Sequence, residues 1–268
     1  MTIQVLVATM DQEDFGLLDR LNIQTDAVVV NQCQTNSYEE FTYKGNTIRW
    51  INDSNRGVSK SRNLALANAT ADICMLCDDD EHFVDGYANV LHQAYYDVPD
   101  ADLIVFNVNR IGWNEKEKAF SRIKRIPRHK TYSTVHLSFR RESIISNDIE
   151  FNEVFGPGSG MYSCAEDSLF CMSCHSKGLK MYVYPKVIAD VQCISSTWFS
   201  GYNERYFYDV GAYLAAAFPH KKHLYKWYYP FRFKNLKSIP NTEMIRYINA
   251  GIDGYHKQKN YDEFFGIE

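Results

Sequence analysis

The amino-acid sequence predicts an α/β fold in which helices cover both faces of a mainly parallel sheet. Short apolar runs alternate with segments of helical periodicity through the first 110 residues. Strands that alternate with helical crossovers form parallel sheets, and strands buried on both faces are almost continuously apolar, as these runs are. The chain shows no internal repeat and no low-complexity linker that would divide it.

The first half of the chain contains five predicted strands and three predicted helices. The strands cover residues 3–7, 27–30, 47–51, 72–77 and 103–108. The helices cover residues 11–22, 60–69 and 84–96. In the first helix the apolar residues recur at helical spacing and are expected to face the core; they are Phe15, Leu17, Leu18 and Leu21.

The second half is less regular. Residues 114–128 are highly charged and are expected to form a surface excursion. Helices are predicted over residues 137–146 and from Glu166 to Lys177, and two short strands over 181–184 and 187–191 around Pro185. From Tyr202 onward the chain is expected to be helical, with interruptions around Pro219, Pro230 and Pro240.

Composition limits the classes of protein that fit. With 268 residues, 45% of them hydrophobic, the chain can form one large domain or one domain with a helical appendage. The net charge of −4 gives no general attraction to nucleic acid. The N-terminus does not resemble a signal peptide, and no apolar run approaches about 18 residues, so a cytoplasmic protein with reduced thiols is expected.

Two C-x-x-C pairs are candidates for zinc binding. Cys74 and Cys77 lie in a predicted strand, where residues three apart point to opposite faces and cannot hold one ion. Cys171 and Cys174 lie on a predicted helix and could share an ion, but no matched second pair exists. Buried thiols are therefore the simpler expectation for both pairs.

An acidic cluster follows the fourth predicted strand directly. The segment DICMLCDDDE ends the apolar run with Asp78, Asp79 and Asp80. Ligands of open α/β sheets collect at the carboxyl ends of the strands, and hard oxygen ligands suit Mg²⁺ or Mn²⁺. The alternative is a solvated acidic turn, but the buried strand that leads into the cluster favours a metal site.

Four segments, in this order and spacing, resemble the family 2 glycosyltransferases with the GT-A fold. They are an N-terminal strand that runs into Ala8-Thr9-Met10, the R-G-x-x-x-x-R-N segment from Arg56 to Asn63, a D-x-D motif at Asp78-Asp79-Asp80, and the pair Glu166-Asp167. Ser195-Ser196-Thr197-Trp198-Phe199 is similar to a segment of bacterial polysaccharide-assembly members. The chain has Asn31-Gln32-Cys33 where many relatives have D-G-S, so the choice of base is less defined.

The resemblance implies a nucleotide-sugar donor, most often a UDP-sugar, and a divalent metal ion, Mn²⁺ or Mg²⁺. Asp80 is the expected first metal ligand, and Asp78 is expected to share the ion or to contact the ribose. The residues expected around the nucleotide are Thr9, Asp11, Asn31, Asp53, Arg56, Arg62, Asp78, Asp79 and Ser196. Alternatives remain for three of them: Asp11 as a helix N-cap, Arg62 as an ordinary helix residue and Asp79 as a solvated carboxylate.

The resemblance also implies an acid–base role for the pair at the start of the helix. An acceptor hydroxyl has a high pKa, so a carboxylate must take its proton as the new bond forms. Asp167 is the expected base, with Glu166 as its neighbour or substitute, in a single displacement that inverts the anomeric carbon. Two acids at a helix start would also serve as partners of the helix dipole.

The expected organisation is a GT-A catalytic domain over residues 1–200 and a helical extension over 201–268. Within the domain, residues 1–110 would bind the nucleotide-sugar and 111–200 the saccharide acceptor. Residues 220–237 contain six Lys or Arg, six aromatic residues and no acid. They suit packing against the extension, or peripheral contact with the inner face of a membrane that carries a lipid-linked acceptor.

Two other functions fit parts of the sequence. A nucleotidyltransferase acting on sugar phosphates would have a glycine-rich basic loop after the first strand, which the segment from Ala8 to Gln12 lacks. A non-catalytic sugar-binding module would leave the acidic cluster and Glu166-Asp167 without a role. A metal-dependent glycosyltransferase in bacterial surface-polysaccharide synthesis explains all four motifs.

Overall fold

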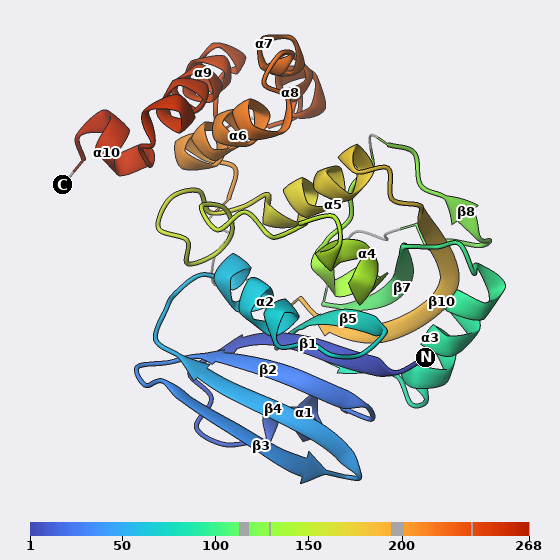
Figure 1. The fold of residues 1–268 in the computed structure, drawn as a ribbon. Coiled ribbons are helices and arrows are strands. Elements are labelled where there is room, and N and C mark those ends of the chain that lie inside the picture. The colour runs from blue at the N-terminus through green and yellow to red at the C-terminus, as the bar shows by residue number, and fades with distance from the viewer. Residues whose placement is uncertain (113–117, 129, 194–200, 237, 268) are drawn as a thin grey trace.

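The computed structural model describes residues 1–112, 118–128, 130–193, 201–236 and 238–267. Figure 1 shows a sheet flanked by helices, with the last part of the chain forming a separate helical layer. The strands are β1 Ile3–Met10, β2 Asp26–Gln32, β3 Ser37–Tyr43, β4 Asn46–Asp53, β5 Ile73–Asp78, β6 Glu81–Phe83, β7 Leu103–Ile111, β8 Lys124–Arg125, β9 Leu137–Arg140 and β10 Met181–Gln192. The helices before the helical layer are α1 Leu17–Arg20, α2 Val58–Ala67, α3 Tyr87–Asp97, α4 Arg141–Ile145 and α5 Glu166–Ser176, with a 3₁₀ turn at Thr134–His136.

Within the described residues the strands form one ten-stranded sheet with the order β3-β4-β2-β1-β5-β9-β7-β10-β6, and β8 pairs with β10. Strands β4, β2, β1 and β5 are parallel neighbours, and β7 pairs in parallel with β10. Strand β9 is antiparallel to both β5 and β7, so those two strands run in the same direction. The predicted α/β fold with a mainly parallel sheet is confirmed.

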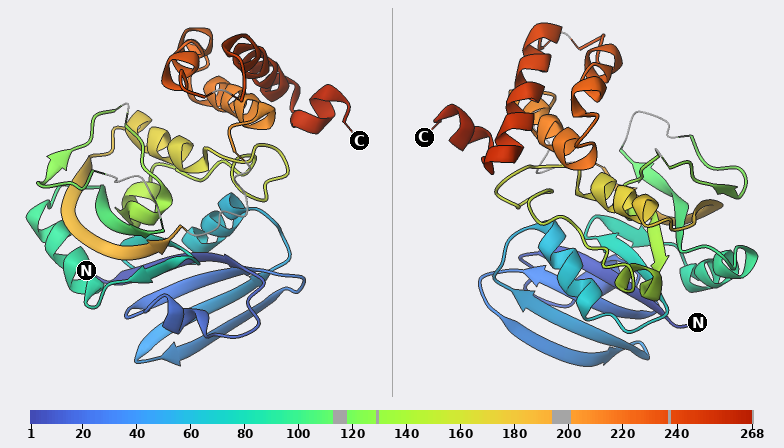
Figure 2. Two further views of the ribbon diagram at one scale, coloured as in Figure 1. Left: turned by 180° about the vertical axis from the view of Figure 1, so that it is seen from behind. Right: turned by 45° about the horizontal axis from the view of Figure 1, so that its top comes forward.

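The two faces of the sheet bury two different sets of side chains. In β1, Val5 and Val7 pack with the leucines of α1 and with Tyr87 and Leu91 of α3. Leu6 points to the other face, where residues of α2, α4 and α5 cover the sheet. Successive side chains of a strand alternate between faces, so a continuously apolar strand fills both cores. Figure 2 shows the helices on both sides of the sheet.

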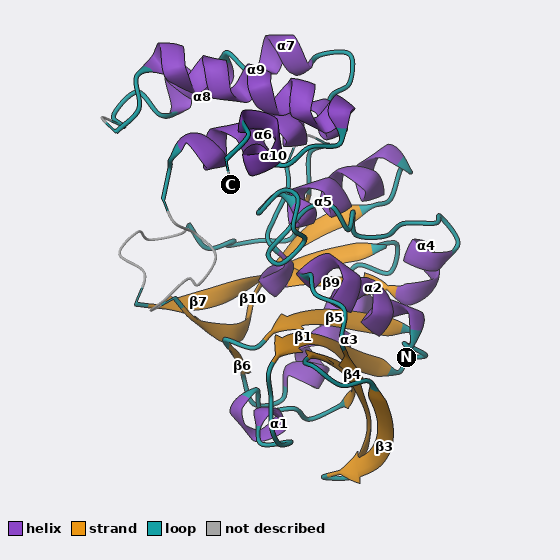
Figure 3. Ribbon diagram, turned by 90° about the vertical axis from the view of Figure 1, so that its left-hand side faces the viewer, coloured by secondary structure: helices purple, strands orange, loops and turns teal. Residues whose placement is uncertain are grey.

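The helical layer contains α6 Glu204–Ala217, α7 Lys222–Tyr225, α8 Tyr228–Arg232, α9 Asn241–Lys257 and α10 Tyr261–Phe265. It lies beyond α5, on the side away from β3 (Figure 3). Helices α6 and α9 cross at glycines: a Cβ atom on Gly211 would lie 2.1 Å from the carbonyl oxygen of Ile248. Tyr208 and Ala212 of α6 share a buried cluster with Phe155 and Leu169, which joins the layer to α5.

Several predicted elements differ from those observed. The helix predicted over 11–22 is a single turn at Leu17–Arg20, because Asp11 has a positive φ of 51° and the Asp14 carboxylate accepts the amide proton of Gly16. Phe15 is 40% exposed rather than buried. The helix predicted over 137–146 is a strand, β9, followed by the short α4, because Leu137 and Phe139 reach the core between β5 and β7.

The two strands predicted around Pro185 form one strand, β10, with irregular pairing to β7 between Tyr184 and Ala189. A proline cannot donate to the sheet, and this irregularity accommodates it. Strands β3 and β6 were not predicted. Strand β3 lies at the exposed sheet edge and β6 has only three residues, so neither forms an apolar run.

The cysteines of both C-x-x-C pairs are buried thiols, as expected. All seven cysteines are free. Cys74 and Cys77 belong to the cores on opposite faces of the sheet, while Cys171 and Cys174 are buried on α5. Among the described residues, no helix has the length and apolar character needed to cross a bilayer.

Candidate active site

The carboxyl ends of four parallel strands bring four of the predicted nucleotide residues to one edge of the sheet: Thr9, Asn31, Asp53 and Asp78. In the strand pairing Thr9 of β1 lies opposite Asn31 of β2, and Gln32 lies opposite Asp53 of β4. Ala8 lies opposite Asp78 of β5. The register of the sheet therefore clusters polar side chains at this edge, where ligands of open α/β sheets bind.

A buried arginine links this edge to the start of α5. Arg62 of α2 is only 4% exposed, and its guanidinium donates to Asp78 Oδ1 at 2.7 Å and to Glu166 Oε1 at 3.1 Å. The guanidinium also lies over the ring of Phe151, with Cζ 5.4 Å from the ring centroid. Residues from β5, α2 and α5, separated by up to 104 positions in sequence, thus form one ion-pair network.

Asp79 and Asp80 follow Asp78 in the acidic cluster, and both are exposed. Asp79 accepts a hydrogen bond from Thr9 Oγ1 at 2.8 Å. The side chain of Asp80 is exposed, although nearby protein atoms displace part of its solvent. This partial desolvation, with repulsion from Asp78 and Asp79, raises the pKa of Asp80 to about 6.

The donor set of the cluster fits a divalent ion that is shared with a ligand. Within the described part of the chain, no group of three or more His, Cys, Asp or Glu side chains could hold a metal ion. Mg²⁺, however, is usually held by one or two carboxylates and completes its shell with substrate phosphates and water. The mutual repulsion of Asp78, Asp79 and Asp80 is the charge imbalance that such an ion would relieve.

Glu81 is a buried acid next to this cluster that the sequence analysis missed. It is 3% exposed, and its Oε1 accepts the amide proton of Asp78 at 2.7 Å. The Oε2 atom is buried, and no group in the described ranges of the chain forms a hydrogen bond with it. Burial and the nearby Asp78 raise the pKa of Glu81 well above its usual range. The sequence contained one signal for this burial: in an extended segment Glu81 lies on the same face as the apolar Phe83, opposite the exposed His82.

Asp167 lies in the first turn of α5 beside the Arg62 network. It is half-buried, and one of its oxygens accepts the amide proton of Ser168 at 2.6 Å. Burial and the neighbouring Glu166 raise the pKa of Asp167 to about 7, while Arg62 acts in the opposite direction. A carboxylate with this pKa can accept a proton near neutral pH.

Four more of the predicted nucleotide residues are Arg56, Asp11, Asp53 and Ser196. Arg56 forms an ion pair with Asp11 at 3.2 Å, and both side chains are exposed. Asp53 is 9% exposed and accepts two hydrogen bonds from Asn55, at 3.1 and 2.9 Å. Ser196 lies outside the described residues.

Asn31 is held by other side chains and by the backbone. Its amide oxygen accepts the amide proton of Gln12 at 3.0 Å, and its nitrogen donates to the carbonyl of Gln12 and to Asn52 Oδ1. Gln12 also donates to Thr9 at 3.0 Å. Gln12 was not among the predicted residues, although it follows the first strand directly.

The acid pair on α5 is preceded by a segment that the helical layer holds in place. Asp209 of α6 is 1% exposed and accepts hydrogen bonds from the backbone nitrogen and the hydroxyl of Ser163, at 2.9 and 2.5 Å. Two residues later Ala165 takes a left-handed conformation, with φ of 82°, and α5 begins. Nothing in the sequence pattern of α6 pointed to this contact.

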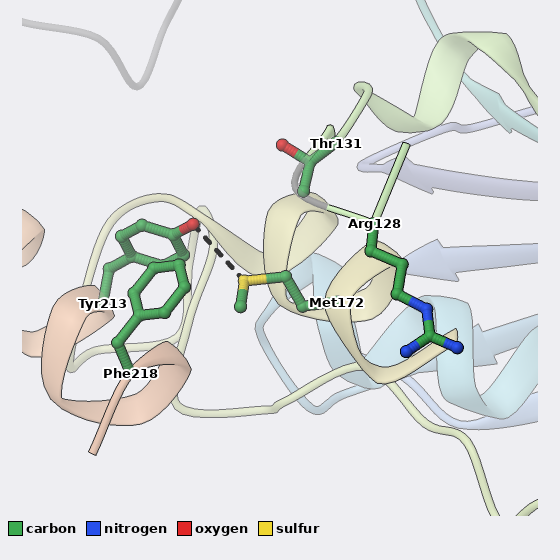
Figure 4. A pocket seen from close by; sticks show the side chains of 5 residues that line it. All are labelled: Arg128, Thr131, Met172, Tyr213 and Phe218. Atoms are coloured by element: carbon green, nitrogen blue, oxygen red, sulfur yellow. Dashed lines mark hydrogen bonds between the residues drawn. The ribbon is translucent and has the colours of Figure 1, made fainter. Parts of the chain in front are cut away.

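A separate small pocket lies between α5 and the helical layer (Figure 4). It measures about 220 Å³ and is lined by Arg128, Thr131, Met172, Tyr213 and Phe218, with the Tyr213 hydroxyl 3.5 Å from the sulfur of Met172. Of the predicted nucleotide, metal and catalytic residues that the structure describes, none lines this pocket. It is therefore distinct from the site at the strand ends.

Comparisons with known proteins agree with this architecture. The family model described as glycosyl transferase family 2 matches residues 21–159, just over half of the chain. The comparison with curated protein sequences found no match.

Solved structures of S. aureus TarS share the fold. Residues 1–349 of TarS align with 95% of this chain and 83% of that one, at 16% identity and a TM-score of 0.60. The complex of the same TarS fragment with UDP-GlcNAc aligns with 97% of this chain and 93% of the TarS chain, at 16% identity and a TM-score of 0.59. A longer TarS structure aligns with 95% of this chain and 54% of its own length, at 17% identity and a TM-score of 0.61.

The mainly parallel sheet, the clustering of acids at its carboxyl edge and the family match lead to one conclusion. The chain belongs to glycosyl transferase family 2 and has the GT-A fold.

Proposed function

We propose that the chain transfers a sugar from a UDP-sugar to a hydroxyl group of a saccharide acceptor, with inversion at the anomeric carbon. The observation that carries this proposal is the Arg62 network. Arg62 binds Asp78, at the strand end, and Glu166, at the start of α5, so donor-side and acceptor-side acids share one site. The binding of UDP-GlcNAc by TarS supports UDP as the nucleotide.

The proposed base is Asp167. It takes the proton of the acceptor hydroxyl as that oxygen attacks the anomeric carbon; the bond to the diphosphate breaks, and UDP leaves with the electron pair. Glu166 is less suited, because Arg62 holds its carboxylate at 3.1 Å. The raised pKa of Asp167, about 7, matches the requirement for a base that works near neutral pH.

The donor half of the site consists of residues 1–110 in this proposal. Thr9 and Asp53 lie at strand ends, and Asp11 and Arg56 form an ion pair. These four residues would contact the nucleotide, with Ser196 from the acceptor half. Asn31 could read the base only by exchanging its bonds to Gln12 and Asn52, so its main role is to support that loop.

Asp80 and Asp78 are the proposed ligands of Mn²⁺ or Mg²⁺. When bound, the ion neutralises the charge that develops on the diphosphate. Because Arg62 already binds Asp78 Oδ1, the exposed Asp80 would be the main ligand and Asp78 would share the ion or contact the ribose through Oδ2. Asp79, which accepts from Thr9, would support the cluster from beside it.

The acceptor in this proposal is a saccharide linked to a lipid, used in the synthesis of a bacterial surface polysaccharide. Such an acceptor would place the enzyme at the cytoplasmic face of the membrane. The support for this part is the basic and aromatic character of residues 220–236. Residues 111–200 would form the acceptor half, and residues 201–268 the helical extension.

The test is nucleotide release from a panel of UDP-, GDP- and dTDP-sugars, with Mn²⁺ or with a chelator. We expect release of UDP that needs the ion, and a loss of about 10²-fold or more in kcat for Asp80→Asn. Asp253→Asn, an exposed acid on α9, is the matched control and should leave the rate unchanged. Release that is equal with chelator, or unchanged in Asp80→Asn, would refute the metal site.

A further inference from the structure

Helices α7 and α8 expose a row of large apolar side chains along one face. Leu224, Trp227, Tyr228 and Phe231 are 67%, 62%, 53% and 74% exposed. Their spacing of three, four and seven residues places them on the same side of a helix. The linking residues Lys226 and Trp227 keep right-handed helical backbone angles, and the amide of Lys226 donates to the carbonyl of Lys222, so the turn between α7 and α8 stays helical.

The opposite side of this segment anchors it to the helical layer. Tyr229, Phe233 and Leu236 pack against the buried core of α6 and α9. Lys226 donates to Asn249 of α9 at 2.9 Å, and Lys222 contacts His256 at 2.8 Å. The exposed row is therefore held outward by packing on its other side. Figures 1 and 3 show α7 and α8 at the outer end of the layer, away from the sheet.

The segment that carries this exposed row is basic and contains no acid, and the ammonium groups of Lys226 and Lys234 lie 5.5 and 6.0 Å from the ring centroids of Trp227 and Phe231. Residues 220–236 contain five basic side chains and no Asp or Glu; the basic ones are Lys221, Lys222, Lys226, Arg232 and Lys234. The chain as a whole carries −4, so the positive charge is local to this surface. Two copies that met through the same face would bring these cations together, which disfavours a symmetric dimer here.

We infer that the face formed by Leu224, Trp227, Tyr228 and Phe231 docks on an anionic lipid bilayer. Aromatic and aliphatic side chains bury at headgroup depth, and flanking lysines and arginines bind the anionic surface. The inference deepens the proposed function, because a bilayer would hold a lipid-linked acceptor. α6 joins this surface to α5, which carries Glu166 and Asp167, so docking and acceptor binding involve the same end of the molecule.

The experiment measures binding of the full chain to vesicles without nucleotide or acceptor, so its outcome is independent of catalysis. Vesicles of phosphatidylcholine alone are compared with vesicles that contain about one third phosphatidylglycerol. We expect binding to the anionic vesicles only, and weaker binding at high salt. Equal binding to both vesicles, or binding to neither, would overturn the inference.

Variants separate this face from other exposed aromatic surface. Phe231→Ser with Trp227→Ser should weaken vesicle binding at least tenfold, and Lys221→Ala with Lys234→Ala should weaken it by about tenfold or more. Tyr96→Ser, 79% exposed on α3, and Lys177→Ala, exposed after α5, are the matched controls. Unchanged binding in the Phe231 and Trp227 double variant would refute this face as the docking site.

Two further measurements distinguish the other occupants. If the free protein is a dimer in solution that Phe231→Ser converts to a monomer, the face is a contact between copies and the inference is wrong.

Folding of each variant is checked by circular dichroism, and removal of these exposed side chains should leave the spectrum unchanged. Membrane docking with no UDP release from any donor would leave the docking inference intact and refute the proposed transfer.

Discussion

At the scale of single residues, the pKa of Asp167 sets the expected pH dependence. Because the pKa is raised to about 7, Asp167 is mostly protonated at pH 6 and mostly ionised at pH 8. Only the ionised form can accept the acceptor proton, so kcat/KM should rise through pH 7 and level off above it. Asp167→Asn should lower kcat by roughly 10²–10⁴-fold and remove this pH dependence.

The control for Asp167 is donor binding. The affinity for UDP, measured by calorimetry, should be nearly unchanged in Asp167→Asn, because the residue is proposed to act on the acceptor. A wild-type profile that falls as pH rises from 6 to 8 would contradict its role as a base. So would a variant that keeps the wild-type rate.

The raised pKa of Asp209 affects the free energy of unfolding, whereas that of Asp167 affects catalysis. Burial raises the pKa of Asp209 to about 6, although Ser163 donates to it. A buried acid of raised pKa favours the folded state below its unfolded pKa, near 3.8, and this contribution is lost as pH rises toward 6. The loss is on the order of 3 kcal/mol for a shift of this size.

We therefore expect Asp209→Asn to flatten the pH dependence of unfolding between pH 4 and pH 6. The measurement is urea unfolding of wild type and variant across this range, and the difference between the two isolates Asp209 from the other raised acids. Ser163→Ala should raise the pKa of Asp209 further, because it removes the hydroxyl group that donates a hydrogen bond to the ionised carboxylate. Identical pH profiles for wild type and Asp209→Asn would refute the assignment.

The residues that sequence could predict are those that follow a recognisable element. Asp78 and Asp80 end an apolar strand, which favours a ligand site there. Glu166-Asp167 begin a helix and were singled out through the family resemblance, because two acids at a helix start also suit the helix dipole. Glu81 was missed because its burial depends on β10, the strand that pairs with β6. Asp209 was missed because its burial depends on the packing of α6 against the distant segment before α5. Local spacing does not contain that information.

At the scale of elements, Arg62 holds α2, β5 and α5 together. Arg62→Gln would leave Asp78 and Glu166 close together without a cation. Breaking a buried ion pair from one side costs about 3–5 kcal/mol, so we expect a loss of this order in the free energy of unfolding. Urea unfolding at pH 7 measures it.

Arg56→Gln is the matched control for Arg62. Arg56 pairs with Asp11, but both side chains are exposed, with 43% and 60% of their surface accessible. Exposed ion pairs contribute about 0–1 kcal/mol, so this variant should unfold close to wild type. Equal losses for the two arginines would mean that the buried network does not stabilise the fold.

Sequence patterns predicted some elements correctly and two helices wrongly. Apolar spacing predicted the parallel strands because each fills two cores. The same patterns predicted a long helix at 11–22, where the Asp14 turn delays the start of the helix to Leu17. They also predicted a helix at 137–146, where the gap between β5 and β7 selects a strand. Competition from a local hydrogen bond or from tertiary packing decided both cases.

At the scale of the whole molecule, the helical layer and the sheet are joined by buried contacts. Tyr208 and Ala212 of α6 pack with Phe155 and Leu169, and Asp209 binds Ser163 in the segment before α5. The sequence predicted a helical extension after Tyr202, but no periodicity could indicate that it would support the segment that carries Glu166 and Asp167. We therefore expect the described layers to unfold together.

The crossing of α6 and α9 provides the test of this coupling. A Cβ atom on Gly211 would lie 2.1 Å from the carbonyl oxygen of Ile248, so Gly211→Ala must push the two helices apart. Overpacking costs about 1–3 kcal/mol, which for a chain of this size lowers Tm by about 5 °C. Scanning calorimetry should show one transition that moves as a whole, while Asp253→Ala on the exposed side of α9 should leave it in place. A second, earlier transition in Gly211→Ala would show instead that the helical layer unfolds alone, and that the acid pair on α5 does not depend on it for stability.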